Sequence, residues 1–243
     1  MTDEQIEFRS DVTVELVRHS ASDADVLFAA RVSTQGEQTL EAASSGAEAS
    51  ERDRGLINYL MRDRHGSPFE HNSLTFYVQA PIFVFREFMR HRIASYNEES
   101  GRYRELRPVF YVPGPDRKLV QVGKPGAYEF EDGTAEQTAL VRDEVIAVCT
   151  QAYESYQRML EAGVAREVAR AVLPVTLYSS MYVTMNARSL MNFLSLRTKR
   201  EGTHFPSFPQ REIEMVAEKM EELWKPLMPM TAETFDQNGR VAP

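Results

Sequence analysis

The chain has 243 residues, 42% of them hydrophobic and 26% charged, which is the balance of an ordinary globular protein with one or two domains. Its formal net charge of −8 argues against bulk nucleic-acid binding, so a local cluster of basic residues is expected to hold anionic small molecules. A single cysteine, no secretory signal and no apolar run near the ~20 residues of a membrane helix predict a soluble cytoplasmic protein without a disulfide or a membrane partner.

The first half of the chain alternates short strands and helices in its apolar periodicity. In chain order we expect a strand at 12–17, a helix at 23–31 capped by Asp23, a mobile loop at 34–50, a helix at 52–64, a strand at 74–78 and a helix at 81–92 that carries Pro81 in its first turn.

The second half is dominated by helical spacing. We expect a strand at 107–112, an irregular Gly/Pro-rich excursion at 113–133, a long helix at 135–160 that ends before Gly163, a shorter helix at 165–172 stopped before Pro174, a strand at 175–184, a helix at 188–197, a loop at 198–209 and a helix at 211–224. No internal repeat and no linker divides the chain, so an α/β fold with a single domain over residues 1–243 is predicted.

Segment 90–103 is the most informative part of the sequence, because it concentrates arginines and contains no lysine. Arg86, Arg104 and Arg107 flank it. A guanidinium group grips phosphate or carboxylate with two parallel hydrogen bonds and stacks on flat rings. The segment therefore favours a phosphorylated ligand that carries a ring, against the plainer alternative of a solvated helix end.

The same segment resembles the signature of the flavin-dependent thymidylate synthases at nine fixed positions, and the similarity extends from about His65 to about Arg197. The nine positions are Arg90, His91, Arg92, Ser95, Asn97, Glu98, Ser100, Arg102 and Tyr103. Such a match is far more specific than a lone glycine-rich loop.

The resemblance implies FAD as cofactor and a set of residues that contact it. The implied set is His65, Ser67, Arg90, His91, Arg92, Glu98, Asn186, Ala187, Arg188 and Asn192. No Gly-x-Gly-x-x-Gly follows a strand, so any flavin must be held another way, and this Arg/His/Asn set offers one. Segment 65–71 holds two histidines, but Pro68 and the spacing argue against a metal site there, and no metal is expected. A plainer role for Asn186 is that of a helix N-cap.

The resemblance also implies dUMP as substrate. Its contacts would be Glu87, Phe88, Met89, Arg90, Glu98, Glu99, Ser100, Gly101, Arg102, Arg170 and Arg197, with Arg197 as the catalytic residue. Ser100 has no His and acid partner nearby in the sequence, so phosphate binding is preferred to a nucleophilic role. Two plainer alternatives are an ion pair that lets Glu98 orient the arginines, and a salt bridge from Arg166 or Arg170 to Glu161 or Glu167.

The implied activity is reductive methylation of dUMP to dTMP, with methylenetetrahydrofolate as carbon donor and NADPH as reductant through FAD. Relatives imply a homotetramer with a largely antiparallel sheet flanked by helices.

Cys149 lies in an apolar helix without a cationic neighbour, so it is expected to be core and not a nucleophile. Two alternatives remain: a flavin-binding protein without methyl transfer, and a single-stranded nucleic-acid binder that stacks bases on Tyr96, Tyr103 and Phe110, which the acidic pI disfavours.

Overall fold

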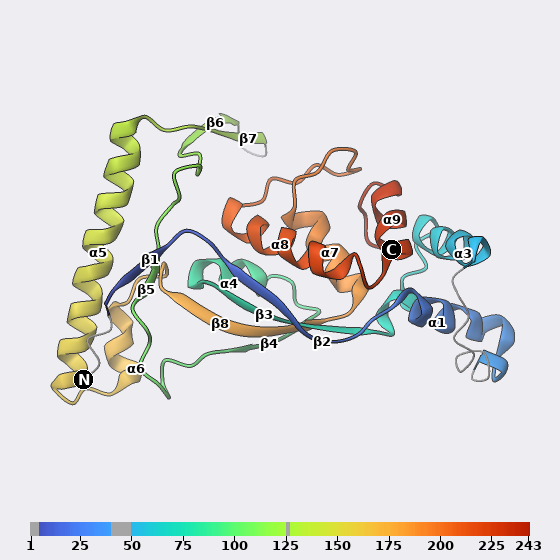
Figure 1. Ribbon diagram of the computed structural model, residues 1–243, viewed down its shortest axis with the longest axis horizontal. Coiled ribbons are helices and arrows are strands. Elements are labelled where there is room, and N and C mark those ends of the chain that lie inside the picture. Colours follow the sequence, from blue (N-terminus) through green and yellow to red (C-terminus); the bar gives the residue numbers. More distant parts are fainter. Residues whose placement is uncertain (1–4, 40–49, 125–126) are drawn as a thin grey trace. The chain divides into compact units, whose positions relative to one another are not determined.

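The computed structural model describes residues 5–39, 50–124 and 127–243, which form a mixed α/β fold with an antiparallel sheet and flanking helices (Figure 1). The strands are β1 (Glu7–Arg9), β2 (Thr13–Ser20), β3 (Ser73–Pro81), β4 (Ser95–Glu98), β5 (Val109–Tyr111), β6 (Val120–Lys124), β7 (Ala127–Glu131) and β8 (Tyr178–Met185). The helices are α1 (Asp23–Gln35), α3 (Glu51–Arg62), α4 (Ile82–Phe88), α5 (Ala135–Glu161), α6 (Arg166–Ala169), α7 (Ala187–Arg197), α8 (Arg211–Trp224) and α9 (Pro229–Gln237), with 3-10 turns η1 (Ser67–Glu70) and η2 (Arg170–Val172).

The main sheet has four strands in the order β2-β3-β8-β4. Two small pairs accompany it: β1 runs parallel to β5, and β6 runs antiparallel to β7. The chain divides into two compact units. The first unit holds the residues up to Thr13, Gln79–Arg90 and Asn97–Met181, and the second holds Val14–Val78, His91–Tyr96 and Tyr182–Pro243.

The first unit is built around the long helix α5. Thr134 opens this helix with a capping box, in which its hydroxyl accepts from the Gln137 N–H and the Gln137 side chain accepts from the Thr134 N–H. The buried face of α5 packs Tyr153 and Tyr156 against Phe110 of β5 and against Leu177. Figure 1 shows β1 and β5 beside α5. This cluster forms the core of the first unit.

The second unit places helices against strand residues that alternate as the sequence predicts. Leu74, Phe76 and Val78 of β3 are fully buried, whereas the residues between them are only partly so. Helix α7 lies beside α8, and α9 lies beside α3 (Figure 1). Trp224 at the end of α8 is fully buried and packs edge-on against Phe235 of α9.

Most predicted elements are confirmed with shifted ends, which include β2, α3, β3, β5, α5, β8, α7, α8 and the loop at 198–209. The helix predicted at 165–172 is divided into α6 and η2, and the helix at 23–31 runs on to Gln35. Of the mobile loop predicted at 34–50, residues 40–49 lie outside the described residues.

Several local predictions are wrong, and strand β1 was not predicted. The helix predicted to reach Arg92 ends at Phe88, and β4 forms inside the segment expected to be a loop. Strand pairing explains this change, because β4 lies beside β8 in the sheet and the Glu99 N–H donates to the Ser180 carbonyl at 2.8 Å. The excursion predicted as irregular contains the antiparallel pair β6–β7, and helix α9 was not predicted at all.

A further error concerns Asp23, which was expected to cap its own helix. Ser22 caps α1 instead, since its hydroxyl accepts from the Asp25 N–H. The buried Asp23 carboxylate accepts from the main-chain N–H groups of Met230 and Thr231 at 2.8 and 2.9 Å. It thereby caps α9, whose free N–H groups and positive dipole end favour a carboxylate.

Candidate active site

The predicted site residues fall into two groups, one in each compact unit. The first unit holds most of the predicted substrate contacts: Glu87, Phe88, Met89, Arg90, Glu98, Glu99, Ser100, Gly101, Arg102 and Arg170. The second unit holds most of the predicted flavin contacts together with the predicted catalytic residue: His65, Ser67, His91, Arg92, Asn186, Ala187, Arg188, Asn192 and Arg197.

In the first unit, a tight turn places Ser100, Gly101 and Arg102 against Arg170. The Arg102 N–H donates to the Ser100 hydroxyl at 3.3 Å, and the Tyr103 N–H donates to the Ser100 carbonyl at 3.1 Å. Gly101 is buried, and a Cβ added there would lie 2.8 Å from Leu106 Cδ1 and 3.3 Å from Arg170 Cδ. The turn is therefore packed against Leu106 and against the Arg170 stem, which lies 69 residues further along the chain.

The Arg102 side chain forms an ion pair with Glu167, with 2.9 Å between Nε and Oε2. Both side chains are about half exposed, at 55% and 54%. An exposed pair of this kind contributes at most about 1 kcal/mol to stability. Glu167 thus meets an arginine of the signature segment, and the pair is weak enough for Arg102 to exchange Glu167 for a stronger anion.

Glu98 lies at the end of β4 with its carboxylate half-buried. Its hydrogen-bond partner is the Ser179 hydroxyl on β8. Burial raises the pKa of Glu98 above its ordinary value, and the neighbouring Glu99 adds to this effect, while Ser179 and the charge of Arg170 oppose it. Glu99 itself pairs with Arg104 at 3.1 Å. Ser179 is a contact that the sequence reasoning missed, because a serine inside a strand carries no local signal.

The end of α4 supplies the remaining predicted substrate residues of the first unit. The Arg90 N–H donates to the Glu87 carbonyl at 3.2 Å and closes the last turn. Phe88 is fully buried, so it can offer a ligand only main-chain groups, whereas Met89 is 45% exposed and the Arg90 side chain is exposed.

In the second unit, Arg188 crosses directly over Gly66. A Cβ at Gly66 would lie 2.5 Å from Arg188 Nε and 2.7 Å from the main-chain oxygen of Pro243. The Arg188 guanidinium donates to that Pro243 oxygen and forms an ion pair with Glu70. Gly66 is therefore a required part of the loop, and the sequence reasoning passed over it although it stands between His65 and Ser67.

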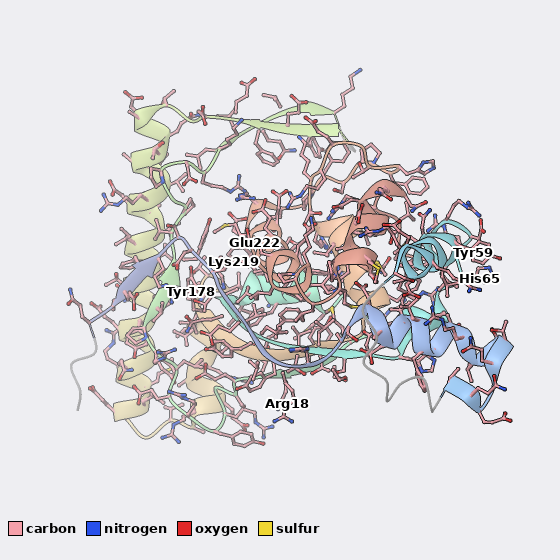
Figure 2. The ribbon with its side chains drawn as sticks, turned by 45° about the vertical axis from the view of Figure 1, so that its right-hand side comes forward. Arg18, Tyr59, His65, Tyr178, Lys219 and Glu222 are labelled. Carbon is pink, nitrogen blue, oxygen red and sulfur yellow. The ribbon has the colours of Figure 1, made fainter. Side chains whose placement is uncertain are left out.

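His65 stands exposed at the end of α3 and stacks on Tyr59, with 5.4 Å between ring centroids and 27° between ring planes. Figure 2 shows the two side chains beside each other next to α3. The Arg62 guanidinium lies over the Tyr59 ring, with its Cζ 5.7 Å from the ring centroid. Tyr59 is 46% exposed and was not among the predicted site residues.

The start of α7 carries three predicted flavin residues in different surroundings. Asn186 is the N-cap, as its plainer role predicted, and its side-chain oxygen accepts from the Ser189 N–H at 2.9 Å. Ala187 is fully buried, and its N–H donates to Asn72 at 2.7 Å. Asn192 lies exposed on the helix surface. Asn186 therefore still offers its amide NH₂ to a ligand, whereas the Ala187 side chain offers nothing.

At the other end of α7, Arg197 donates from Nε to His91 Nε2 at 3.1 Å. The His91 ring also meets Phe193 edge-on, with 4.8 Å between centroids. Burial, together with the charge of Arg197, lowers the pKa of His91 to about 4. The structure thus brings together a predicted flavin residue and the predicted catalytic residue.

Cys149 is buried in α5, and its thiol shares a hydrogen bond of 3.3 Å with the Thr176 hydroxyl. Burial raises the pKa of the thiol. A reactive cysteine needs the opposite shift, so the prediction that Cys149 belongs to the core is confirmed. Within the three described ranges, no three His, Cys, Asp or Glu side chains gather as metal ligands, and no helix is long and apolar enough to cross a membrane.

Comparison with known proteins assigns the chain to a family. Residues 15–230 match the family model described as thymidylate synthase complementing protein. The flavin-dependent thymidylate synthase of Streptomyces avermitilis is 69% identical over 237 residues, which cover 97% of this chain and 95% of the relative, and that of Streptomyces coelicolor is 67% identical over 242 residues, which cover 99% and 97%.

Solved structures agree with this assignment. The structure of the UMP/dUMP methylase PolB from Streptomyces cacaoi bound with 5-Br dUMP has a TM-score of 0.91 to this chain at 56% identity, with 98% of this chain and 100% of the other covered. The same methylase bound with 5-Br UMP gives a TM-score of 0.89. The chain therefore belongs to the flavin-dependent thymidylate synthase family.

Proposed function

We propose that this protein is a flavin-dependent thymidylate synthase that converts dUMP to dTMP by reductive methylation. Methylenetetrahydrofolate would donate the carbon unit, and NADPH would supply the reducing equivalents through FAD. Family membership over almost the whole chain supports the activity. Within the structure, the observation that carries the proposal is the turn at 100–102, whose central Gly101 packs against Leu106 and the Arg170 stem.

This turn suits the phosphate of dUMP. The Ser100 hydroxyl, the Arg102 guanidinium and the Arg170 guanidinium offer hydrogen bonds and two positive charges within a short span. Arg102 would leave Glu167 for the phosphate, because its charge-assisted hydrogen bonds to the phosphate would be stronger than its exposed ion pair with Glu167. Glu98 at the end of β4 and Glu99 directly after it would stand beside the nucleotide. The residues at and just after the end of α4 would contribute too: Glu87, Phe88, Met89 and Arg90.

The donor groups of the second unit fit FAD. Arg92 and Arg188 are exposed cations suited to a diphosphate, and the exposed Asn192 and the Asn186 NH₂ suit the polar edges of a flat ring. His65, already stacked on Tyr59, offers a flat surface, and Ser67 offers a hydroxyl beside it. When bound, FAD would supply the redox chemistry, while the protein supplies orientation and charge.

Arg197 would act on the uracil ring. Its guanidinium stays protonated at any physiological pH, so it cannot serve as a general base. It can favour an ionised, enolate-like ring by charge and hydrogen bonding. The burial of Cys149 supports such a non-covalent role, because a cysteine nucleophile would have to reach the ring with a thiolate.

We further propose that residues 1–243 form one functional domain that assembles as a cytoplasmic homotetramer with active sites built between protomers, as the resemblance to the family implies. Size-exclusion chromatography with light scattering tests the assembly directly. A monomer that makes dTMP would contradict the shared sites without affecting the proposed activity.

The activity itself is tested by incubating purified protein with FAD, dUMP, methylenetetrahydrofolate and NADPH, and by following dTMP by chromatography. We expect dTMP that depends on every component. A protein that turns yellow with FAD but yields no dTMP would support the alternative of flavin binding without methyl transfer. A colourless protein that binds single-stranded nucleic acid would overturn both flavin proposals.

A further inference from the structure

The hydrogen bond between Arg197 and His91 fixes the protonation of the imidazole. Arginine carries only donors, so at 3.1 Å the Arg197 Nε–H must donate and His91 Nε2 must accept. A neutral imidazole carries one proton, which then resides on Nδ1. A doubly protonated His91 could not make this contact, because both of its nitrogens would be donors.

The imidazole is held in place by the same helix that carries Arg197. Phe193, one turn earlier on α7, is fully buried and meets the His91 ring edge-on at 77°. On the other side, the Tyr96 hydroxyl donates to the His91 main-chain oxygen at 2.7 Å. Ring and backbone of His91 are therefore both fixed, so His91 can serve as a rigid acceptor for a long and flexible side chain.

The charges around His91 favour the neutral form that this contact needs. Arg197 faces the ring from α7, and Arg90 and Arg92 flank His91 in the sequence, so the charged groups on both elements are cationic. The hydroxyl of Tyr96 stays protonated, because burial raises its pKa to about 12. His91 is thus suited to a constant acceptor role, not to a proton-transfer role near neutral pH.

We propose that His91, besides any contact with the flavin, is a positioning residue that holds the guanidinium of Arg197 in its working orientation. The bond uses the Nε–H of the guanidinium. Because the guanidinium is planar, fixing Nε also restricts the direction in which the two terminal nitrogens point. Loss of this bond removes the His91 acceptor from a side chain that has four rotatable bonds. The inference rests on the proposed function, in which Arg197 acts on the substrate ring.

Two substitutions separate positioning from packing. His91→Phe keeps a flat ring against Phe193 but removes the acceptor, whereas His91→Gln places an amide oxygen near the position of Nε2. We expect kcat for dTMP formation to fall on the order of 100-fold in His91→Phe, since small misplacements of a reacting group cost about that much. His91→Gln should recover most of the loss. His204→Phe, at an exposed histidine of the same unit, should leave kcat unchanged.

A double-substitution cycle then tests whether His91 acts through Arg197. In Arg197→Lys, a methylene replaces Nε, so the bond to His91 cannot form. We expect His91→Phe to lower kcat no further, within about twofold, in the Arg197→Lys background. Independent losses that multiply, or a His91→Gln variant as poor as His91→Phe, would overturn the proposal, provided the flavin absorbance of the variants matches that of the wild type.

A readout without turnover comes from solid-state ¹⁵N NMR of histidine-labelled protein, in which the signal of His91 is the one lost in His91→Gln among the five histidines. We expect a neutral ring at pH 7 with Nε2 unprotonated and the proton on Nδ1. A proton on Nε2 would overturn the inference whether or not the protein makes dTMP. A wild-type protein with this tautomer but no dTMP formation would instead count against the proposed function alone.

Discussion

Replacing Arg102 by alanine should weaken dUMP binding about 30-fold while leaving deoxyuridine binding nearly unchanged. Arg102 sits on the Ser100 turn beside the Arg170 stem, and its side chain is 55% exposed. A hydrogen bond to a charged group contributes about 1.5–3 kcal/mol, and the Glu167 pair that Arg102 gives up costs less than about 1 kcal/mol. The difference, about 2 kcal/mol, corresponds to about 30-fold in the dissociation constant.

The assay is isothermal titration of each variant with dUMP and with deoxyuridine, which lacks the phosphate. Arg104→Ala is the matched control, because Arg104 lies two residues further on and pairs with Glu99 instead. Glu167→Gln is the converse variant: it removes the competing carboxylate and should tighten dUMP binding up to about fivefold. Equal weakening of dUMP and deoxyuridine in Arg102→Ala, or an Arg104→Ala loss as large, would refute phosphate recognition by Arg102.

Three further predictions follow from the site. Cys149→Ala should retain turnover and lose on the order of 1 kcal/mol of unfolding free energy in a denaturant titration, and complete loss of turnover in the folded variant would restore the cysteine as nucleophile. Arg197→Lys keeps the charge but loses the planar fork, so kcat should fall roughly 100-fold with FAD still bound; near-normal kcat would remove Arg197 from the mechanism. The pKa of His91 is lowered from 6.5 to about 4 in the folded protein, so the unfolded chain binds the proton more tightly. The stability that comes from the neutral His91 is therefore complete above pH 6.5 and is lost as the pH falls toward 4. The unfolding free energy should therefore fall between pH 7 and pH 5, and His91→Phe should remove that part of its pH dependence; an unchanged pH dependence would contradict the shift.

The sequence by itself determined most helices and strands, because their signals lie within a few residues. The helical spacing that ends before Gly163 predicts α5, Asn186 predicts the N-cap of α7, and the alternation of Leu74, Phe76 and Val78 predicts β3. The signature segment likewise indicated the family, which the comparisons then confirmed. These inferences depend on residue type and spacing alone.

Pairings across long stretches of chain were decided only by the tertiary structure. Asp23 looks like the cap of its own helix, yet its carboxylate caps α9, 207 residues away. Glu167 stands next to Arg166 in the sequence, yet its partner is Arg102. A charged side chain has many possible partners of similar strength, so its neighbours in sequence do not determine which one it meets.

The contacts within the candidate site were likewise decided only by the tertiary structure. The resemblance to the family named Arg102, Arg170, His91 and Arg197 as site residues, but it did not indicate which of them touch. Gly101 against Arg170 and Arg197 against His91 are contacts between residues 69 and 106 positions apart. Such contacts arise only when packing of the buried cores brings distant segments to a few ångströms, since hydrogen bonds and van der Waals contacts act over that range alone.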